Sequence, residues 1–259
     1  MPPFAQCRAG INKLPDTNMQ IRDADPATAE AACPQCALNK LCFPIALPDA
    51  FQSLLPLAGE KRVRLARGDL LFRASHEQTG IYAVKAGFLK TCVPLADGQS
   101  RIVGFQATGD VMGLDGLGTG IHKTDAIALN RCEICVIPLD KFEALLEHPA
   151  ESVHVRQLLA REITRVEEHA AALGTLSAKQ RVATFLLDMS AKWEDRGYSR
   201  TAFVLFMSRK DIGNFLGLTF ETVSRILSYF QVQKWITVQG KNVLIRDLSA
   251  LQSQLTRAT

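Results

Sequence analysis

The hydrophobic pattern of this 259-residue chain changes from strand-like to helical spacing close to Pro138. Before that point short apolar or alternating runs recur, and eleven of the 17 glycines fall between residues 59 and 120, as the turns between many short strands require. The pair Asp97-Gly98 is a hairpin signal between two of these runs. This region therefore predicts an antiparallel β-roll or jelly roll. The expected strands are 63–65, 70–72, 81–84, 88–93, 102–105, 126–129 and 134–137.

Helical spacing follows Pro138, with a short helix expected up to Glu147 and a long one from about Pro149 to Leu173. Along the long segment five apolar residues step by four, three, four and three, which is the a/d pattern of a coiled coil. Charged residues flank this stripe, as they flank an exposed seam. We expect a dimerisation helix that pairs with a second copy of the chain; the alternative is a helix packed on its own β-roll. The stripe consists of Leu159, Ile163, Val166, Ala170 and Leu173.

Residues 208–230 have the layout of a helix-turn-helix. Ser208 can cap the first helix with Asp211 reaching back to it, Gly217 permits the sharp turn, and Thr219 can cap the second helix. The neighbouring elements complete a winged form of this motif. They are a helix opened by a capping box at 177–180, a strand at 203–207 and a hairpin made by 236–238 and 243–245.

The second helix of this motif has one apolar face and one polar face. The polar residues suit base edges, since Arg can donate twice to guanine, Glu can accept from cytosine and Ser can serve several bases. They lie in the half of the helix that enters the major groove. The alternative is a surface helix in which Glu221 and Arg225 form an i,i+4 pair. The candidate DNA-contacting residues are Glu221, Ser224, Arg225, Thr219, Ser208 and Arg209.

The net charge of +4 is unevenly distributed, because residues 175–259 hold 12 Lys and Arg against 6 Asp and Glu. Such an excess on one domain is the usual footprint of a polyanion partner. No apolar run approaches the roughly 18 to 20 residues that span a bilayer, and the first thirty residues lack the apolar core of a signal peptide. We expect a cytoplasmic protein that binds double-stranded DNA and no membrane.

Three of the seven cysteines, Cys33, Cys36 and Cys42, lie within ten residues at the spacing C-x2-C-x5-C. Thiolates are soft ligands, so in a reducing compartment this cluster is typical of zinc or an iron-sulfur centre rather than a disulfide. The five histidines show no clustered pair, and no catalytic constellation accompanies the cysteines, so we do not expect an enzyme. The residues alone leave zinc and iron-sulfur open.

Beyond its first thirty residues the chain resembles the CRP/FNR superfamily of bacterial transcription regulators, and within it the oxygen-sensing fumarate and nitrate reduction regulators. The resemblance rests on the cysteine spacing, on Thr108-Gly-Asp-Val-Met-Gly-Leu-Asp115, and on the run from Asp211 to Arg225. The fold class expected is α+β, with an antiparallel β-roll like a cyclic-nucleotide-binding jelly roll. The expected domains are a mobile N-terminal arm (1–30), an iron-sulfur sensor with the β-roll (31–148), a dimerisation helix (149–174) and a winged helix-turn-helix DNA-binding domain (175–259).

The resemblance implies a 4Fe-4S cluster held by Cys33, Cys36, Cys42 and a fourth cysteine from the end of the roll. The candidates are Cys132 and Cys135, and anchoring on the family's cysteine two residues before an Ile-Pro pair selects Cys135. The two are three residues apart, so on a strand they point to opposite faces and only one can be a ligand.

The family's mechanism implies that the intact cluster lets the long helices pair into a homodimer, and that oxygen degrades it to a 2Fe-2S form and then to apoprotein, separating the dimer. Two recognition helices related by a two-fold axis can bind a palindrome together, whereas one makes about half the contacts. The match at Glu221, Ser224 and Arg225 implies a TTGAT-type half-site. RNA polymerase is the other partner implied of such an activator, with the loops 97–100 and 116–122 as candidate contacts.

Other members of the superfamily bind cyclic AMP through a Gly-Glu pair and an Arg-Ser-Ala element. The corresponding residues here are Gly109-Asp110-Val and His122-Lys-Thr-Asp-Ala126, without an arginine and with an added acid, Asp125. We therefore expect no cyclic nucleotide. The alternative function is a CRP-like regulator with a structural zinc site or a small-molecule effector.

Overall fold

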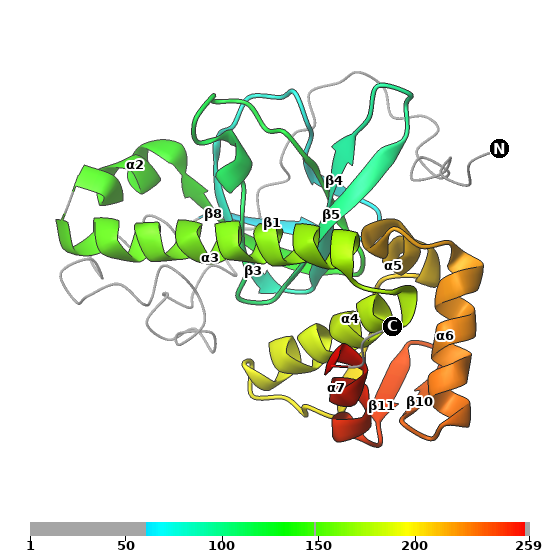
Figure 1. Cartoon of the computed structure of the whole chain (residues 1–259). Coiled ribbons are helices and arrows are strands. Elements are labelled where there is room, and N and C mark those ends of the chain that lie inside the picture. The colour runs from blue at the N-terminus through cyan, green and yellow to red at the C-terminus, as the bar shows by residue number, and fades with distance from the viewer. Residues whose placement is uncertain (1–60, 148, 257–259) are drawn as a thin grey trace. The chain divides into compact units, whose positions relative to one another are not determined.

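The computed structural model describes residues 61–147 and 149–256 (Figure 1). The chain divides into two compact units, and the boundary lies between Glu162 and Ile163, inside the longest helix. The expected N-terminal arm and the cysteines Cys33, Cys36 and Cys42 lie outside the described residues. Within the described ranges, no helix is long and apolar enough to cross a membrane.

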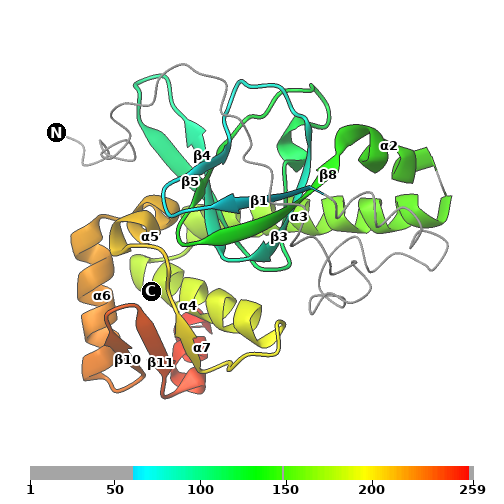
Figure 2. The ribbon, with the colours of Figure 1, turned by 180° about the vertical axis from the view of Figure 1, so that it is seen from behind.

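Two four-stranded antiparallel sheets form the N-terminal roll, with strand orders β1-β8-β3-β6 and β2-β7-β4-β5. Figure 2 shows β1, β8 and β3 side by side. The expected roll is confirmed, and the structure adds two short elements that the hydrophobic pattern does not reveal, β6 (Val111–Met112) and the 3-10 turn η5 (Leu114–Gly116). The other strands are β1 (Lys61–Leu65), β2 (Leu70–Phe72), β3 (Gly80–Ala86), β4 (Phe88–Pro94), β5 (Ser100–Ala107), β7 (Asp125–Ala128) and β8 (Cys132–Pro138).

The core of the roll lies between the two sheets, and β8 contributes every second residue to it. Cys132, Ile134 and Val136 are buried in one cluster with Phe72 and Leu89 from the opposite sheet. The residues between them on β8 are only partly buried, as the two-residue period of a strand requires.

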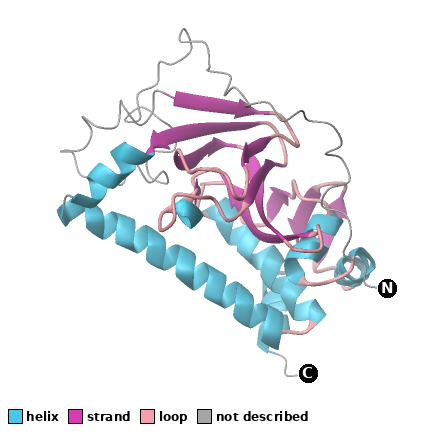
Figure 3. Ribbon diagram, turned by 90° about the horizontal axis from the view of Figure 1, so that it is seen from above, coloured by secondary structure: helices cyan, strands magenta, loops and turns pink. Residues whose placement is uncertain are grey.

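The outer face of sheet β1-β8-β3-β6 is packed at one end by α2 (Leu139–Glu147) and α3 (Pro149–Thr175). Ile81 and Ile137 pair directly across β3 and β8, and both pack with Phe142 of α2 and Val155 of α3. Leu159 is partly buried against the same cluster. Figure 3 shows α3 as one long uninterrupted helix, so its first half packs on its own roll while the helix continues beyond.

The C-terminal unit is a winged helix-turn-helix, as expected. The capping box at Ser177 and Gln180 opens α4. The strand expected at 203–207 ends at Val204, opposite Asn242 at the start of β11, and the N–H of Leu205 then donates to the Lys241 carbonyl oxygen (2.8 Å). The elements are α4 (Ala178–Glu194), β9 (Ala202–Val204), α5 (Arg209–Leu216), α6 (Phe220–Val232), β10 (Ile236–Gln239), β11 (Asn242–Ile245) and α7 (Leu248–Thr256).

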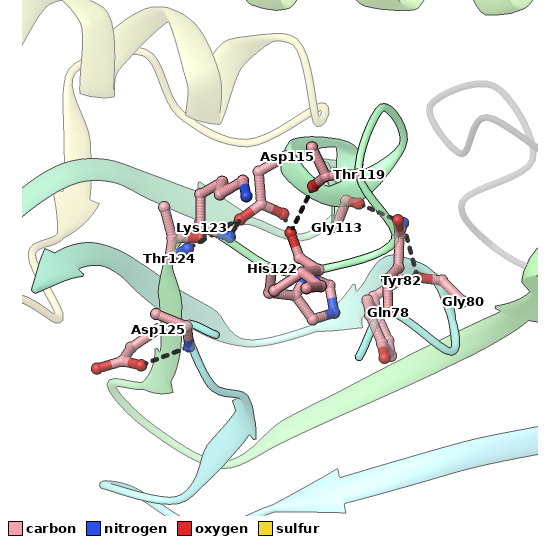
Figure 4. A network of polar contacts seen from close by, with 12 residues as sticks. Gln78, Gly80, Tyr82, Gly113, Asp115, Thr119, His122, Lys123, Thr124 and Asp125 are labelled. Atoms are coloured by element: carbon pink, nitrogen blue, oxygen red, sulfur yellow. Dashed lines mark hydrogen bonds and ion pairs between the residues drawn. The ribbon is translucent and has the colours of Figure 1, made fainter. Parts of the chain in front are cut away.

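The loop between η5 and β7 folds around the carboxylate of Asp115 (Figure 4). Its Oδ2 accepts hydrogen bonds from the backbone N–H groups of Lys123 (2.8 Å) and Thr124 (2.9 Å) and from the Thr124 hydroxyl (2.8 Å). Its Oδ1 lies 3.2 Å from Nδ1 of the buried His122, whose ring stacks on Phe72. Burial alone would raise the pKa of Asp115, but the hydrogen bonds from His122, Thr124 and Lys123 bring it below its usual value.

Gly87 makes the turn from β3 to β4 with a positive φ of 102°. A Cβ there would lie 2.6 Å from both the Arg131 carbonyl oxygen and the Cys132 Sγ. We expect Gly87→Ala to lower the free energy of unfolding by about 3 kcal/mol, through backbone strain and overpacking together. Urea denaturation measures the loss. Gly98→Ala is the matched control, since Gly98 also has positive φ but no atom within 4 Å of an added Cβ. Equal losses in the two variants would refute the steric argument.

Replacing Asp115 by Asn removes the charge and one acceptor oxygen while keeping the size. Since a donor left unpaired on burial costs roughly 1–3 kcal/mol, we expect Asp115→Asn to destabilise the protein by about 2 kcal/mol at neutral pH. A lowered pKa means that the carboxylate stabilises the fold above its unfolded-state pKa of about 3.9 and that this contribution is lost as the pH falls through the folded-state pKa. Urea unfolding at decreasing pH should therefore show the two proteins converging in acid; a constant difference would contradict this.

Candidate functional site

The caps of the helix-turn-helix are those that its sequence predicts. Ser208 Oγ accepts the N–H of Asp211 (3.1 Å), and the Asp211 carboxylate accepts the N–H of Ser208 (3.0 Å). Helix α5 ends at Gly217, with φ 67°. Thr219 Oγ1 accepts the N–H of Thr222 (3.2 Å) and so begins α6. Local hydrogen bonds therefore define both ends of the turn.

Helix α6 has the expected two faces. Val223, Ile226, Leu227 and Phe230 are buried. Glu221 and Arg225 are exposed, and Ser224 is partly exposed. The polar face is thus available to a groove of DNA without disturbing the packing of the helix.

The polar side chains of α5 and α6 contact one another loosely. Arg209 Nη1 donates to Ser224 Oγ (3.4 Å), and Arg225 Nη2 donates to Thr222 Oγ1 (3.4 Å). The pKa of Glu221 is lowered first by a hydrogen bond from its own backbone N–H, then by the Thr219 hydroxyl, and least by the charge of Arg225. Glu221 is therefore an ionised acceptor at neutral pH.

The two candidate fourth ligands lie on opposite faces of β8, as their spacing predicts. Cys132 is buried in the core of the roll, where its thiol donates to the Phe88 carbonyl oxygen (3.3 Å) and contacts the Asn130 carbonyl oxygen (3.4 Å). Burial raises the pKa of the Cys132 thiol. Cys135 is partly exposed on the outer face. A thiolate is thus disfavoured at Cys132, whereas Cys135 lies on the partly exposed face.

Basic residues surround the outer face near Cys135. In the strand register Cys135 lies opposite Arg62 of β1 and Ala83 of β3. On the same face Glu133 accepts from Lys85 (2.9 Å) and forms an ion pair with Arg62 (3.5 Å). Cys135 therefore shares the outer face with two basic side chains and the acidic one that pairs with both.

Among the residues that the structure describes, no three His, Cys, Asp or Glu side chains come together as a metal site. The other three expected ligands, Cys33, Cys36 and Cys42, lie outside those residues. Four thiols are a donor set that suits an iron-sulfur cluster or zinc. The outer-face thiol of Cys135 fits that set, whereas the core thiol of Cys132 does not.

The stripe expected on α3 is largely uncovered within one chain. Ile163 is 59% exposed and Val166 is 57% exposed, and Ala170 is also exposed. Leu159 and Leu173 are partly buried. The exposed part of the stripe therefore begins where the contact of α3 with the roll ends.

The added acid Asp125 does not lie free in the region that corresponds to the nucleotide site of cyclic AMP binders. Its Oδ1 accepts the N–H of Ala74 (2.8 Å). The sequence interpretation missed Asp115, whose carboxylate takes the N–H groups of Lys123 and Thr124 in this region. Its donors lie eight and nine residues further along, so no local pattern marks it.

Two known domain families match the chain. Residues 62–148 match the cyclic nucleotide-binding domain, and residues 180–254 match the Crp-like helix-turn-helix domain. Among solved structures, FixK2 from Bradyrhizobium japonicum is similar, with a TM-score of 0.70 and 28% identity over 77% of this chain and 98% of that one.

Curated relatives cover most of the chain and carry the names of transcription regulators. The transcriptional regulatory protein btr of Bordetella pertussis is 38% identical over 88% of this chain and 95% of its own length. The transcriptional activator protein Anr of Pseudomonas protegens is 36% identical over 84% and 90%. The fumarate and nitrate reduction regulatory protein of Escherichia coli is 34% identical over 85% and 88%. The chain therefore belongs to the CRP/FNR family of transcription regulators and carries that family's DNA-binding helix-turn-helix.

Proposed function

We propose that this protein is a cytoplasmic, oxygen-responsive regulator in which Cys33, Cys36, Cys42 and Cys135 hold a 4Fe-4S cluster. The observation that carries the proposal is the position of Cys135 on the outer face of β8, beside the row of residues on which α3 packs. When bound, the cluster would be the group that reacts with oxygen. The names of the relatives support this direction, since the Escherichia coli relative is named a fumarate and nitrate reduction regulatory protein.

The path from Cys135 to α3 is short. Ile137 follows Cys135 by two residues, so it lies on the same face about 7 Å further along the strand. Ile137 packs directly with Phe142 and Val155, which join α2 and α3 to the sheet. A displacement of β8 at Cys135 would therefore change the packing of Ile137 against α2 and α3.

The homodimer would form through α3. Ile163 and Val166 are too exposed for a lone helix of this length, and burying them against a second copy gains roughly 25 cal/mol for each Å² of apolar surface. Paired helices would bring two recognition helices to one palindrome of TTGAT-type half-sites, with 149–174 acting as dimerisation helix and 175–259 as DNA-binding domain. Ser208, Arg209 and Thr219 would contact the DNA beside Glu221, Ser224 and Arg225.

RNA polymerase would meet exposed loops of the roll. Leu95, beside the loop 97–100, is 45% exposed, and Ile121, within the loop 116–122, is 42% exposed. The loops are proposed by their exposure alone, since single exposed apolar side chains are normal on any protein surface.

The match to the cyclic nucleotide-binding domain raises a small-molecule effector as the alternative. The donors of the corresponding loop are already taken by the Asp115 carboxylate, whose charge would also repel a phosphate. We therefore propose that the roll responds through its outer face rather than to a cyclic nucleotide.

Matched alanine variants test the fourth ligand. After anaerobic purification we expect the wild-type chain and Cys132→Ala to hold about four irons each, and Cys135→Ala to hold markedly fewer. The physical reason is the accessible outer-face thiol at Cys135. Iron and sulfide assays give the count, and gel filtration before and after exposure to air gives the oligomeric state. Iron retained in Cys135→Ala but lost in Cys132→Ala would reverse the assignment. A colourless zinc protein, or a dimer indifferent to air, would overturn the proposed function.

Substitutions on α6 test base recognition. We expect Arg225→Ala and Glu221→Ala each to lower the preference for a TTGAT palindrome over a palindrome with one changed base pair by about 10-fold or more, since a good base contact is worth roughly 1–3 kcal/mol. Fluorescence anisotropy at fixed salt measures both affinities. Gln233→Ala, exposed at the C-terminal end of the same helix, is the control and should change neither. An unchanged preference in both variants would show that these residues do not read bases.

A further inference from the structure

The C-terminal end of α5 is held by side chains from two other helices. The ring of Phe215 stacks on His169 of α3, with centroids 4.0 Å apart and planes 9° from parallel. The same ring meets Phe185 of α4 edge-on at 6.2 Å. His169 and Phe215 belong to the same compact unit, which begins at Ile163. Phe215 therefore joins α5 to α4 and to the second half of α3.

An arginine holds the same end of α5 by hydrogen bonding. Arg181 of α4 donates from Nη1 to the carbonyl oxygen of Leu216, the last residue of α5, at 2.7 Å. Carbonyl groups at a helix C-terminus lack partners within the helix and carry a partial negative charge, so a guanidinium is a favourable cap there. The contact is independent of the ring stack, because it comes from another helix and involves the backbone.

The direction of α6 follows from that of α5, because the turn between them is tight. The N–H of Leu218 donates to the Gly213 carbonyl oxygen at 2.8 Å. A Cβ on Gly213 would lie 2.7 Å from the Leu218 carbonyl oxygen, so the two segments touch without space for a side chain. Holding the end of α5 therefore also holds the recognition helix.

We propose that His169, Phe215 and Arg181 are positioning residues that fix each recognition helix to its dimerisation helix and thereby set the half-site spacing that the protein accepts. His169 is adjacent to Ala170 of the exposed stripe. Pairing of α3 with a second copy would therefore fix the position of His169 relative to the dimer axis. Half-sites read by a symmetric dimer lie about 34 Å apart, one turn of DNA, and a shift of one base pair also rotates the half-site about the axis. A recognition helix fixed to its dimerisation helix cannot reach a half-site shifted by one base pair, whereas a loosely connected one can. The inference rests on the proposed dimer.

The test is a spacing profile. Affinities of the full-length protein, purified anaerobically, are measured for palindromes whose half-site separation changes in single base-pair steps, and for a lone half-site. For the wild type we expect a sharp optimum, with a loss of about tenfold for one step, the order expected when DNA must be deformed to fit. For His169→Ala we expect a flattened profile, with unchanged dimerisation by sedimentation and unchanged affinity for the lone half-site.

Two further variants separate positioning from folding. His169→Phe keeps a ring that can stack, so it should restore the sharp profile. Arg181→Gln removes the charge from the second contact and should flatten the profile independently. Alanine is the best helix former and His169 is only partly buried, so His169→Ala should fold. Glu167→Ala, an exposed change on the same helix, is the matched control.

The outcomes are distinct. A sharp profile retained in both His169→Ala and Arg181→Gln would overturn the inference, as would an equal loss of affinity for every DNA, including the lone half-site. A wild type that binds palindrome and lone half-site equally well would instead overturn the proposed dimeric function, and the inference with it.

Discussion

The two-residue period of β8 is the constraint on which the rest of the roll depends. It sends Cys132, Ile134 and Val136 into the core and leaves Cys135 and Ile137 on the opposite face. Because the strand is paired on both sides, with β1 and β3, it cannot slip by one residue without exchanging the two sets. One strand therefore separates a thiol buried in the core from a thiol on the partly exposed outer face. It also places the outer-face thiol beside the contact that supports α3.

Helix α3 contacts the roll along its first half and the helix-turn-helix along its second half. Its first half packs on the roll through Val155 and Leu159. In its second half Ile163 and Val166 are exposed, and His169 stacks on Phe215 of the helix-turn-helix. The boundary between the two compact units lies inside the helix rather than in a linker.

Local signals explain which features could be predicted from the sequence. The caps at Ser208 and Thr219, the hairpin at Asp97-Gly98 and the two faces of α6 depend on residues a few positions apart, and all are confirmed. Strand β6 has two residues and thus no period to detect. The carboxylate of Asp115, the stack of His169 on Phe215 and the cap of Leu216 by Arg181 join residues between seven and 46 positions apart. Only the folded chain brings these groups together.

A ligand can switch a protein only between two states of similar free energy. The two sides of the roll differ in how far their polar groups are already satisfied within the chain. The loop around Asp115 has its donors satisfied by its own carboxylate, so an external anion would have to displace a bound charge and would gain little. The outer face of β8 is different. There Glu133 is shared by Arg62 and Lys85, and the thiol of Cys135 lies opposite Arg62 in the register. Adding or removing anionic ligands at this thiol would redistribute these ion pairs one step from Ile137. The outer face of β8 therefore holds Glu133, with its two cationic partners, on the strand whose Ile137 packs in one cluster with Val155 of α3.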